Sequence, residues 1–199
     1  VVSELCELIE LPHAIYKLAI WRGRNGVITP NFLVDDEVYA AGNEVLFRLD
    51  STYPKAERKA KKHTIETITK AFELLNMQLP KGNLPSNIKT AKQVFLGYLM
   101  LDAWIGNTDR HHENWALVQS LENEILTNRL APTHDHAASL GSILKNEERK
   151  SRLTTRDKGY SIETYTSKGR SAIFEKETDK KPLLLLDAFR VASSHNPEA

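Results

Sequence analysis

Apolar positions recur at the three-and-four spacing of a helix in three parts of the chain. Residues 2–11 show this spacing over a short amphipathic stretch, and residues 64–75 show it again. From about 90 to 105 nearly every position is apolar, which is typical of a helix buried in the middle of a helical domain. Gly106 is a natural C-terminal cap for that helix, and Pro182 opens a last helical run.

Extended segments lie between the first two helical patterns. Residues 14–21 predict a strand, Asn25 and Gly26 a turn, and residues 28–34 a second extended piece. Residues 35–49 then resume a helical or mixed pattern. The chain is therefore expected to carry a small β element near its N-terminus.

A second β element is predicted after the buried helix. Residues 115–119 have the pattern of a strand, residues 120–124 that of a turn, and residues 125–130 that of a second strand. The resulting hairpin leads the chain back toward the end of the buried helix. Residues 142–181 are charged and weakly periodic, and a further strand is predicted within them at 160–165.

Composition narrows the classes of function. The chain has 199 residues, of which 41% are hydrophobic and 27% charged, so it is long enough to bury a core as one domain or one large lobe. Its formal net charge is only +1, so no global field favours nucleic acid or anionic lipid. We expect no direct nucleic-acid binding, and the basic stretch 53–63 is predicted to be a solvated face or loop.

The single cysteine and the absence of long apolar windows limit the cellular locations that the sequence predicts. Cys6 excludes an internal disulfide and a multi-cysteine metal site, and is predicted to be a small core residue. No window approaches about 18 uninterrupted apolar residues, and the N-terminal stretch has no basic leader, so neither a membrane span nor a signal peptide is predicted. A cytoplasmic location is expected.

The densest polar run of the chain, "WIGNTDRHHENW", begins where the buried helix ends. Within it, Asp109 and Asn114 lie five positions apart, and Asp135 follows after the predicted hairpin. This is the order of the groups used in phosphoryl transfer: an Asp that receives the substrate hydroxyl proton, an Asn on Mg²⁺, and a second Asp on Mg²⁺. Mg²⁺ prefers oxygen ligands and takes few of them from the protein, because it keeps water and phosphate oxygens.

The segments "GNTDRHHENW" and "LAPTHDHAASLG" together resemble the HipA-like kinases, bacterial serine/threonine kinases related to toxin-antitoxin systems. A more distant resemblance joins the first segment to the D-R-H-x-x-N loop of the phosphatidylinositol-kinase-like group. The likeness runs from the first helix to residues 169–174. It implies that Asp109 is the catalytic Asp and that Asn114 and Asp135 bind the metal, with ATP and Mg²⁺ as cofactors.

The resemblance implies an α+β, protein-kinase-like fold with a mostly helical C-terminal lobe and a small β remnant of the N-terminal lobe. Residues 1–36 would form the remnant and residues 37–199 the helical lobe. Within that lobe we expect a catalytic loop at 106–118, a metal-binding loop at 134–141 and an activation-loop-like segment at 142–181.

The remaining polar groups near these loops are given supporting roles. Arg110 and His111 are expected to orient the catalytic loop through hydrogen bonds, and His136 to support the metal-binding loop, as the family's residues do. His112 and Glu113 are predicted to be solvated. Trp104 and Trp115, which flank the loop, are expected to be core anchors. Asn31 and Phe32 are expected to lie beside the adenine of ATP.

A kinase covers the phosphates with a Gly-rich loop and pairs them with a strand Lys, both before the first helix. No glycine precedes Gly23 and no lysine precedes Lys17. We therefore expect the chain to be a fragment that is inactive by itself. The family resemblance suggests a protein substrate, such as an aminoacyl-tRNA synthetase among translation factors, and an antitoxin partner.

Two other functions remain open at this stage. A degraded kinase fold would act as a binding module that recognises a partner protein without transferring phosphate. Four histidines near acids would also suit a metal hydrolase, although that function explains neither Asn114 nor the hairpin. These histidines are His111, His112, His134 and His136.

Overall fold

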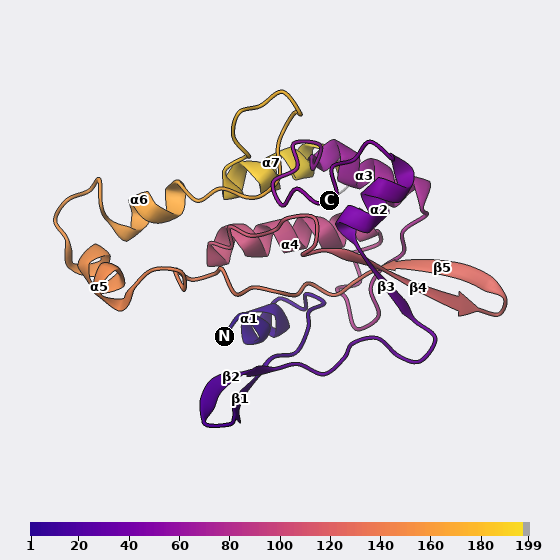
Figure 1. Cartoon of the computed structure of the whole chain (residues 1–199), viewed down its shortest axis with the longest axis horizontal. Coiled ribbons are helices and arrows are strands. Elements are labelled where there is room, and N and C mark those ends of the chain that lie inside the picture. The colour runs from indigo at the N-terminus through magenta and orange to yellow at the C-terminus, as the bar shows by residue number, and fades with distance from the viewer. Residues whose placement is uncertain (197–199) are drawn as a thin grey trace.

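The computed structural model describes residues 1–196, so the last three residues of the predicted helical lobe, 197–199, lie outside the described part. The helices and strands form one mostly helical body with two small sheets (Figure 1). The order is α1 (Val2–Leu8), β1 (Lys17–Trp21), β2 (Arg24–Ile28), β3 (Val38–Ala41), α2 (Gly42–Leu49), α3 (Ile65–Leu74), α4 (Ala91–Ile105), β4 (Ala116–Glu122), β5 (Ile125–Leu130), α5 (Asn146–Thr154), α6 (Ile162–Ser167) and α7 (Leu185–Ser194).

Helix α4 lies at the centre of the fold, with α3 and α7 packed against it (Figure 1). The prediction of a buried helix is confirmed to within one residue. Thr90 closes a capping box with Gln93, and Gly106 ends the helix in the left-handed conformation at φ 67°. The core cluster around α4 includes Phe95, Leu99 and the distant Trp115.

Strands β3, β4 and β5 form an antiparallel sheet in that order. The predicted β4–β5 hairpin is confirmed, but its turn is shorter than the predicted 120–124: β4 continues to Glu122, and the turn consists of Asn123 and Glu124, whose φ angles are 51° and 66°. Strand β3 pairs with β4 from Val38 opposite Gln119 to Ala41 opposite Ala116. The sheet therefore holds the C-terminal end of the polar loop, at Trp115, next to the start of α2.

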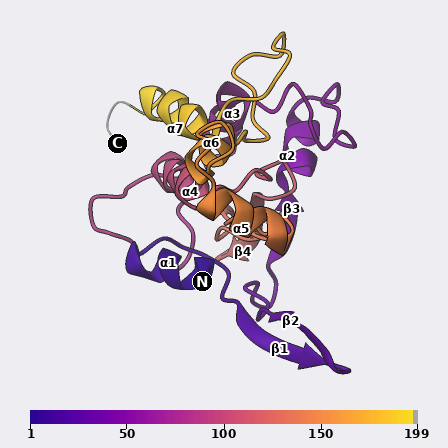
Figure 2. The same ribbon diagram turned by 90° about the vertical axis from the view of Figure 1, so that its left-hand side faces the viewer.

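The N-terminal hairpin β1–β2 was predicted with its turn at the wrong residues. The turn lies at Arg22 and Gly23, with φ angles of 48° and 73°, whereas Asn25 and Gly26 lie within β2. Pairing of Trp21 with Arg24 leaves room for only a two-residue loop, and such a loop needs positive φ at both positions. The hairpin projects from the body of the molecule (Figure 2).

Residues 142–181 contain two short helices, α5 and α6, and α6 occupies the position of the strand predicted at 160–165. The alternation at 160–165 resembles a strand, but the Ser161 side chain accepts a hydrogen bond from the Thr164 amide and starts α6 instead. Helix α7 begins at Leu185 rather than at Pro182, because Leu183 exchanges backbone hydrogen bonds with Ser171 and Ile173. Helices α5 and α6 extend away from α4 (Figure 1).

The basic stretch 53–63 is a loop between α2 and α3 that is mostly exposed, as predicted, but its two ends are buried. Tyr53 and His63 have exposed fractions of 3% and 1%. His63 accepts a hydrogen bond from Trp115 Nε1 at 3.0 Å, and its Nδ1 lies 3.0 Å from the Ala172 carbonyl oxygen. Nδ1 therefore carries the proton of a neutral ring that joins three distant parts of the chain.

His63 is expected to make the fold sensitive to acid. Burial lowers its pKa to about 3, below the ordinary value near 6.5 that it regains on unfolding. Between these values the unfolded chain binds more protons, so the free energy of unfolding should fall as the pH is lowered from 7.5 to 5. Urea unfolding at the two pH values measures this loss. His63→Gln should show a smaller difference, and equal stability of the wild type at both values would contradict the assignment.

Membrane-spanning structure is not found among the helices of residues 1–196. None of them combines the length and the apolar character needed to cross a bilayer.

Candidate functional site

The loop that carries Asp109 is tied to the end of α4. The Asn107 amide donates to the Asp102 carbonyl at 2.9 Å, and Asn107 Nδ2 donates to Asp102 Oδ1 at 2.8 Å. Asn107 Oδ1 in turn accepts from the Asp109 amide at 3.2 Å. Because α4 packs in the core, these bonds place the Asp109 carboxylate on a rigid support while its side chain stays 27% exposed.

Arg110 is the polar centre of the site. Its guanidinium is fully buried and binds the Asp102 carboxylate through Nε and Nη2, both at 2.8 Å. Burial alone would lower the pKa of Arg110, but the Asp102 charge outweighs it and raises that pKa. Nη1 donates to the Asn114 carbonyl at 2.6 Å and Nη2 to Thr133 Oγ1 at 2.9 Å. One side chain thus joins the catalytic loop to the loop that contains Asp135.

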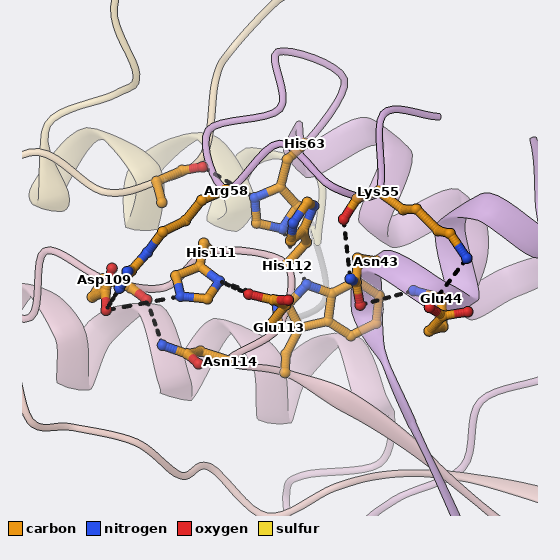
Figure 3. A network of polar contacts seen from close by, with 12 residues as sticks. Asn43, Glu44, Lys55, Arg58, His63, Asp109, His111, His112, Glu113 and Asn114 are labelled. Atoms are coloured by element: carbon orange, nitrogen blue, oxygen red, sulfur yellow. Dashed lines mark hydrogen bonds and ion pairs between the residues drawn. The ribbon is translucent and has the colours of Figure 1, made fainter. Parts of the chain in front are cut away.

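Asn114 is buried and its amide group has a fixed orientation. Nδ2 donates to the Asp109 carbonyl oxygen at 2.7 Å, and the Asn114 backbone amide donates to the His111 carbonyl at 2.9 Å (Figure 3). Within residues 1–196 no hydrogen bond reaches Oδ1. Asn114 Oδ1 is therefore available as a metal ligand, while Nδ2 of the same amide group holds the loop together.

The two histidines of the loop are structural. His111 Nδ1 accepts from the Glu113 amide at 3.2 Å, and its Nε2 lies 3.8 Å from Asp109 Oδ2. Burial lowers the pKa of His111, against the opposing effect of the Asp109 carboxylate. The prediction that His112 is solvated was wrong: its ring is 1% exposed and its Nδ1 lies 2.8 Å from the Tyr53 hydroxyl. Glu113, by contrast, is exposed as predicted.

Arg58 faces Asp109 and was missed by the sequence analysis. Its Nη2 forms an ion pair with Asp109 Oδ2 (Figure 3). The residue lies 51 positions upstream in a basic run without periodicity, so no spacing in the sequence pointed to it. The pair holds one carboxylate oxygen of Asp109, and no hydrogen bond from the described residues reaches the other.

Asp135 lies in a loop that is clamped by the segment before β1. The Thr133 amide donates to the Pro12 carbonyl at 3.0 Å, and the Ala14 amide donates to the Thr133 carbonyl at 2.9 Å. The Asp135 amide donates to the Tyr16 hydroxyl at 3.0 Å, and the residue has φ 53°. This backbone turn leaves the carboxylate exposed and without an ion pair among the described residues.

His136 supports the same loop through its ring. Its Nε2 lies 2.9 Å from Thr133 Oγ1, the hydroxyl that also accepts from Arg110. Burial lowers the pKa of His136 to about 3, so the ring is neutral at physiological pH and stays a hydrogen-bonding group. Arg110, Thr133 and His136 therefore form one chain of contacts across the site.

Phe32 and Asn31, the two residues predicted to lie beside the adenine, have different surroundings from each other. The Phe32 ring lies 5.9 Å from the His134 ring and 6.3 Å from the Tyr39 ring, so it contacts the residue before Asp135. The Asn31 side chain is exposed and accepts from the Leu33 amide at 3.1 Å, within its own turn. Phe32 thus borders the Asp135 loop, whereas Asn31 serves local backbone structure.

Gly42, the first residue of α2, packs directly against the end of the catalytic loop. The Gly42 amide donates to the Trp115 carbonyl at 2.8 Å, and a Cβ at Gly42 would lie 2.2 Å from the Trp115 ring and 2.5 Å from the His112 carbonyl oxygen. Only glycine allows this approach. Trp115 is a core anchor as predicted, but the same prediction for Trp104 was wrong, since that side chain is 57% exposed.

The donor set fits Mg²⁺ better than a histidine-bound metal. Asn114 Oδ1 and the Asp135 carboxylate are hard oxygen donors without protein partners in residues 1–196, and Mg²⁺ takes one or two such ligands beside water and phosphate. Among the described residues, the clustered His, Cys and acidic donors are His111, His112 and Glu113, within 4.8 Å of one another. His134 and His136, the other two histidines considered for a metal hydrolase, are not part of that cluster.

The imidazole rings of His134 and His136 make hydrogen bonds within the protein. His134 Nδ1 lies 2.9 Å from the Pro132 carbonyl and its Nε2 lies 3.1 Å from the Tyr39 hydroxyl. His136 Nε2 is held by Thr133. His134 and His136 therefore have supporting roles, and within residues 1–196 the four histidines do not come together in one metal site.

A cavity of about 770 Å³ opens on one side of the site. Asp109, His111 and Gly106 contribute to its wall from the catalytic loop, and Trp104 from the last turn of α4. Asn114 and Asp135 do not line it. Asp109 therefore faces two regions, the cavity and the pair of metal-binding candidates.

The comparisons with known proteins bear on the fold. No protein-family model matches the sequence, and no curated protein matches it either. The structure is similar to the crystal structure of the Helicobacter pylori proinflammatory kinase CtkA, with a TM-score of 0.68 at 15% sequence identity. The match covers 91% of this chain and 60% of the CtkA chain, so the chain spans less than two thirds of that kinase. The chain has a kinase-like α+β fold.

Proposed function

We propose that the protein is an ATP- and Mg²⁺-dependent serine/threonine protein kinase of the HipA-like type. The observation that carries the proposal is the bond from Asn114 Nδ2 to the Asp109 carbonyl, with Arg110 joining this loop to Thr133 beside Asp135. The bond fixes the Asn114 side chain, and with it Oδ1, against the backbone of the residue that carries the Asp109 carboxylate. Such fixed positions supply most of the catalysis in phosphoryl transfer.

The residues divide the work by position. Asp109 would orient the acceptor hydroxyl and take its proton as the hydroxyl oxygen bonds to the γ-phosphorus, while the bond to the bridging oxygen breaks and ADP leaves. Asn114 and Asp135 would hold Mg²⁺, which supplies charge neutralisation on the phosphates. Arg110 positions both loops without contacting substrate, because it is fully buried.

Transfer of label from γ-labelled ATP to a protein acceptor tests the proposal. The assay uses the chain together with any sequence that precedes it in the full protein, with Mg²⁺ and with a chelator. We expect labelled phosphoserine or phosphothreonine only with Mg²⁺. Nucleotide binding without any transfer would favour a kinase-like binding module instead. The HipA-like resemblance further suggests translation factors such as aminoacyl-tRNA synthetases as acceptors and an antitoxin as regulatory partner.

Asn114→Ala and Asp135→Ala are each expected to weaken binding of Mg²⁺-ATP far more than binding of metal-free ATP. The reason is that both side chains are proposed to meet the nucleotide through the cation, so removing either oxygen affects only the metal-dependent part of binding. Calorimetric titration with and without Mg²⁺ separates the two. Asn128→Ala, an amide in β5 that lies outside the loops, serves as the control. Equal losses in both titrations would rule out a shared metal site.

A further inference from the structure

The cavity beside Asp109 has a mixed wall. Apolar side chains form one part of it, and three of them are largely exposed: Trp104 at 57%, Ile143 at 65% and Leu153 at 68%. They come from α4, from the segment after Gly141 and from α5. An exposed apolar surface inside a concave site is typical of a binding surface.

The charged part of the wall is almost entirely basic. Asp109 is the one acidic residue among its lining residues in the described chain. The basic lining residues are Arg58, Lys59, Arg149, Arg152, Lys168 and Arg170. The whole chain has a net charge of only +1, so this concentration of positive charge is a local feature.

Three of these basic groups have charge available for a ligand. Lys59 and Lys168 are exposed and take part in no hydrogen bond or ion pair from their side chains within residues 1–196. Arg149 contacts only the neutral Asn146 side chain, at 2.5 Å. These residues come from the basic stretch, the end of α6 and α5, and they converge on one cavity.

Arg152 has a different, structural part in the same wall. It bonds Glu148 at 3.0 Å, and its guanidinium carbon lies 4.1 Å from the Tyr160 ring centre and 5.0 Å from that of Tyr165. These contacts connect α5 with Tyr160 and with Tyr165 of α6. The positive charges on the two helices are thereby kept on the same side of the cavity.

We propose that this cavity binds an acidic segment of the protein substrate. Carboxylates of that segment would meet Lys59, Arg149 and Lys168, and its serine or threonine would reach Asp109. The metal-binding candidates lie outside the cavity wall, so the nucleotide and the acceptor would approach Asp109 from different sides. The assignment as a substrate site rests on the proposed kinase function, whereas the preference for acidic peptides rests on the cavity alone.

Peptide binding tests the preference without relying on phosphate transfer. The probe is a short fluorescein-labelled peptide with one serine flanked by Asp and Glu, compared with the same peptide carrying Lys and Arg instead. Fluorescence anisotropy should show the acidic peptide binding at least about tenfold more tightly, with the difference shrinking at high salt. Equal or reversed affinities would overturn the proposal.

The double substitution Lys59→Glu with Lys168→Glu should weaken binding of the acidic peptide about tenfold, because two attractions become repulsions. The matched control, Lys150→Glu with Lys180→Glu, makes the same charge change outside the cavity wall and should bind like the wild type. Equal losses of affinity in both variants would show that only the net charge matters, and would overturn the proposed site.

The transfer assay on the same peptides separates the two proposals. Selective binding followed by labelled product supports both. Selective binding without transfer supports the acidic-peptide site and contradicts the kinase function. Transfer to acidic and basic peptides at equal rates supports the kinase function and contradicts the acidic-peptide site.

Discussion

Replacing Asp109 with Asn should lower phosphoryl transfer by about 10²- to 10⁴-fold, the range supplied by a positioned general base. The substitution keeps the size of the side chain and its place on the rigid loop after α4. It removes the negative charge that orients the acceptor hydroxyl and receives its proton. Nucleotide affinity should change little, because Asp109 is not among the proposed metal ligands.

Label transfer from γ-labelled ATP measures this effect, with circular dichroism to verify the fold. Asp157→Asn is the matched control, since Asp157 is exposed and lies outside the cavity and both loops. Near wild-type transfer by Asp109→Asn would remove Asp109 from the proposed mechanism. A loss of similar size in the control would point to a general effect on the segment 142–181.

Breaking the buried Arg110–Asp102 pair should lower the free energy of unfolding by roughly 3 to 5 kcal/mol. Asp102→Ala leaves a fully buried guanidinium without its counter-charge, and Arg110→Ala leaves a buried carboxylate in the same position. Both groups also hold the loops, since Asp102 binds Asn107 and Arg110 binds Thr133. Urea unfolding of each variant gives the loss.

The double substitution Arg110→Met with Asp102→Leu separates stability from positioning. Two apolar side chains of similar volume should recover much of the lost stability, because no charge then remains buried. Phosphoryl transfer should stay low in this variant, since the contact from the catalytic loop to Thr133 is still missing. Recovery of transfer together with stability would show that Arg110 has no positioning role.

The parts of the site that are close in sequence could be predicted. Helix α4 was located to within one residue because its apolar run is bounded by Thr90 and Gly106, which act as caps. Asp109 and Asn114 lie in one short loop, so their spacing alone restricts their geometry. Asp135 follows a hairpin whose return direction is set by strand pairing.

Contacts between distant segments could not be predicted from the sequence. Arg58 meets Asp109 across 51 positions, and Tyr53 meets His112 across 59, with no pattern to mark either partner. Trp104 was predicted to be a core anchor because it flanks the polar loop, but α4 is apolar nearly all round, so periodicity did not show that this position faces outward. At 160–165 the cap at Ser161 decided the structure against the strand-like alternation.

Binding of paramagnetic Mn²⁺ with ATP, followed by NMR, tests the central claim most directly. Mn²⁺ replaces Mg²⁺ at oxygen ligands and broadens the signals of nuclei close to it. The account predicts that the amide signals of Asn114 and Asp135 disappear first, while those of the β1–β2 hairpin tip near Gly23 persist. Broadening that is centred on His111–Glu113 and spares Asp135, or that occurs equally at all exposed acidic residues, would contradict it.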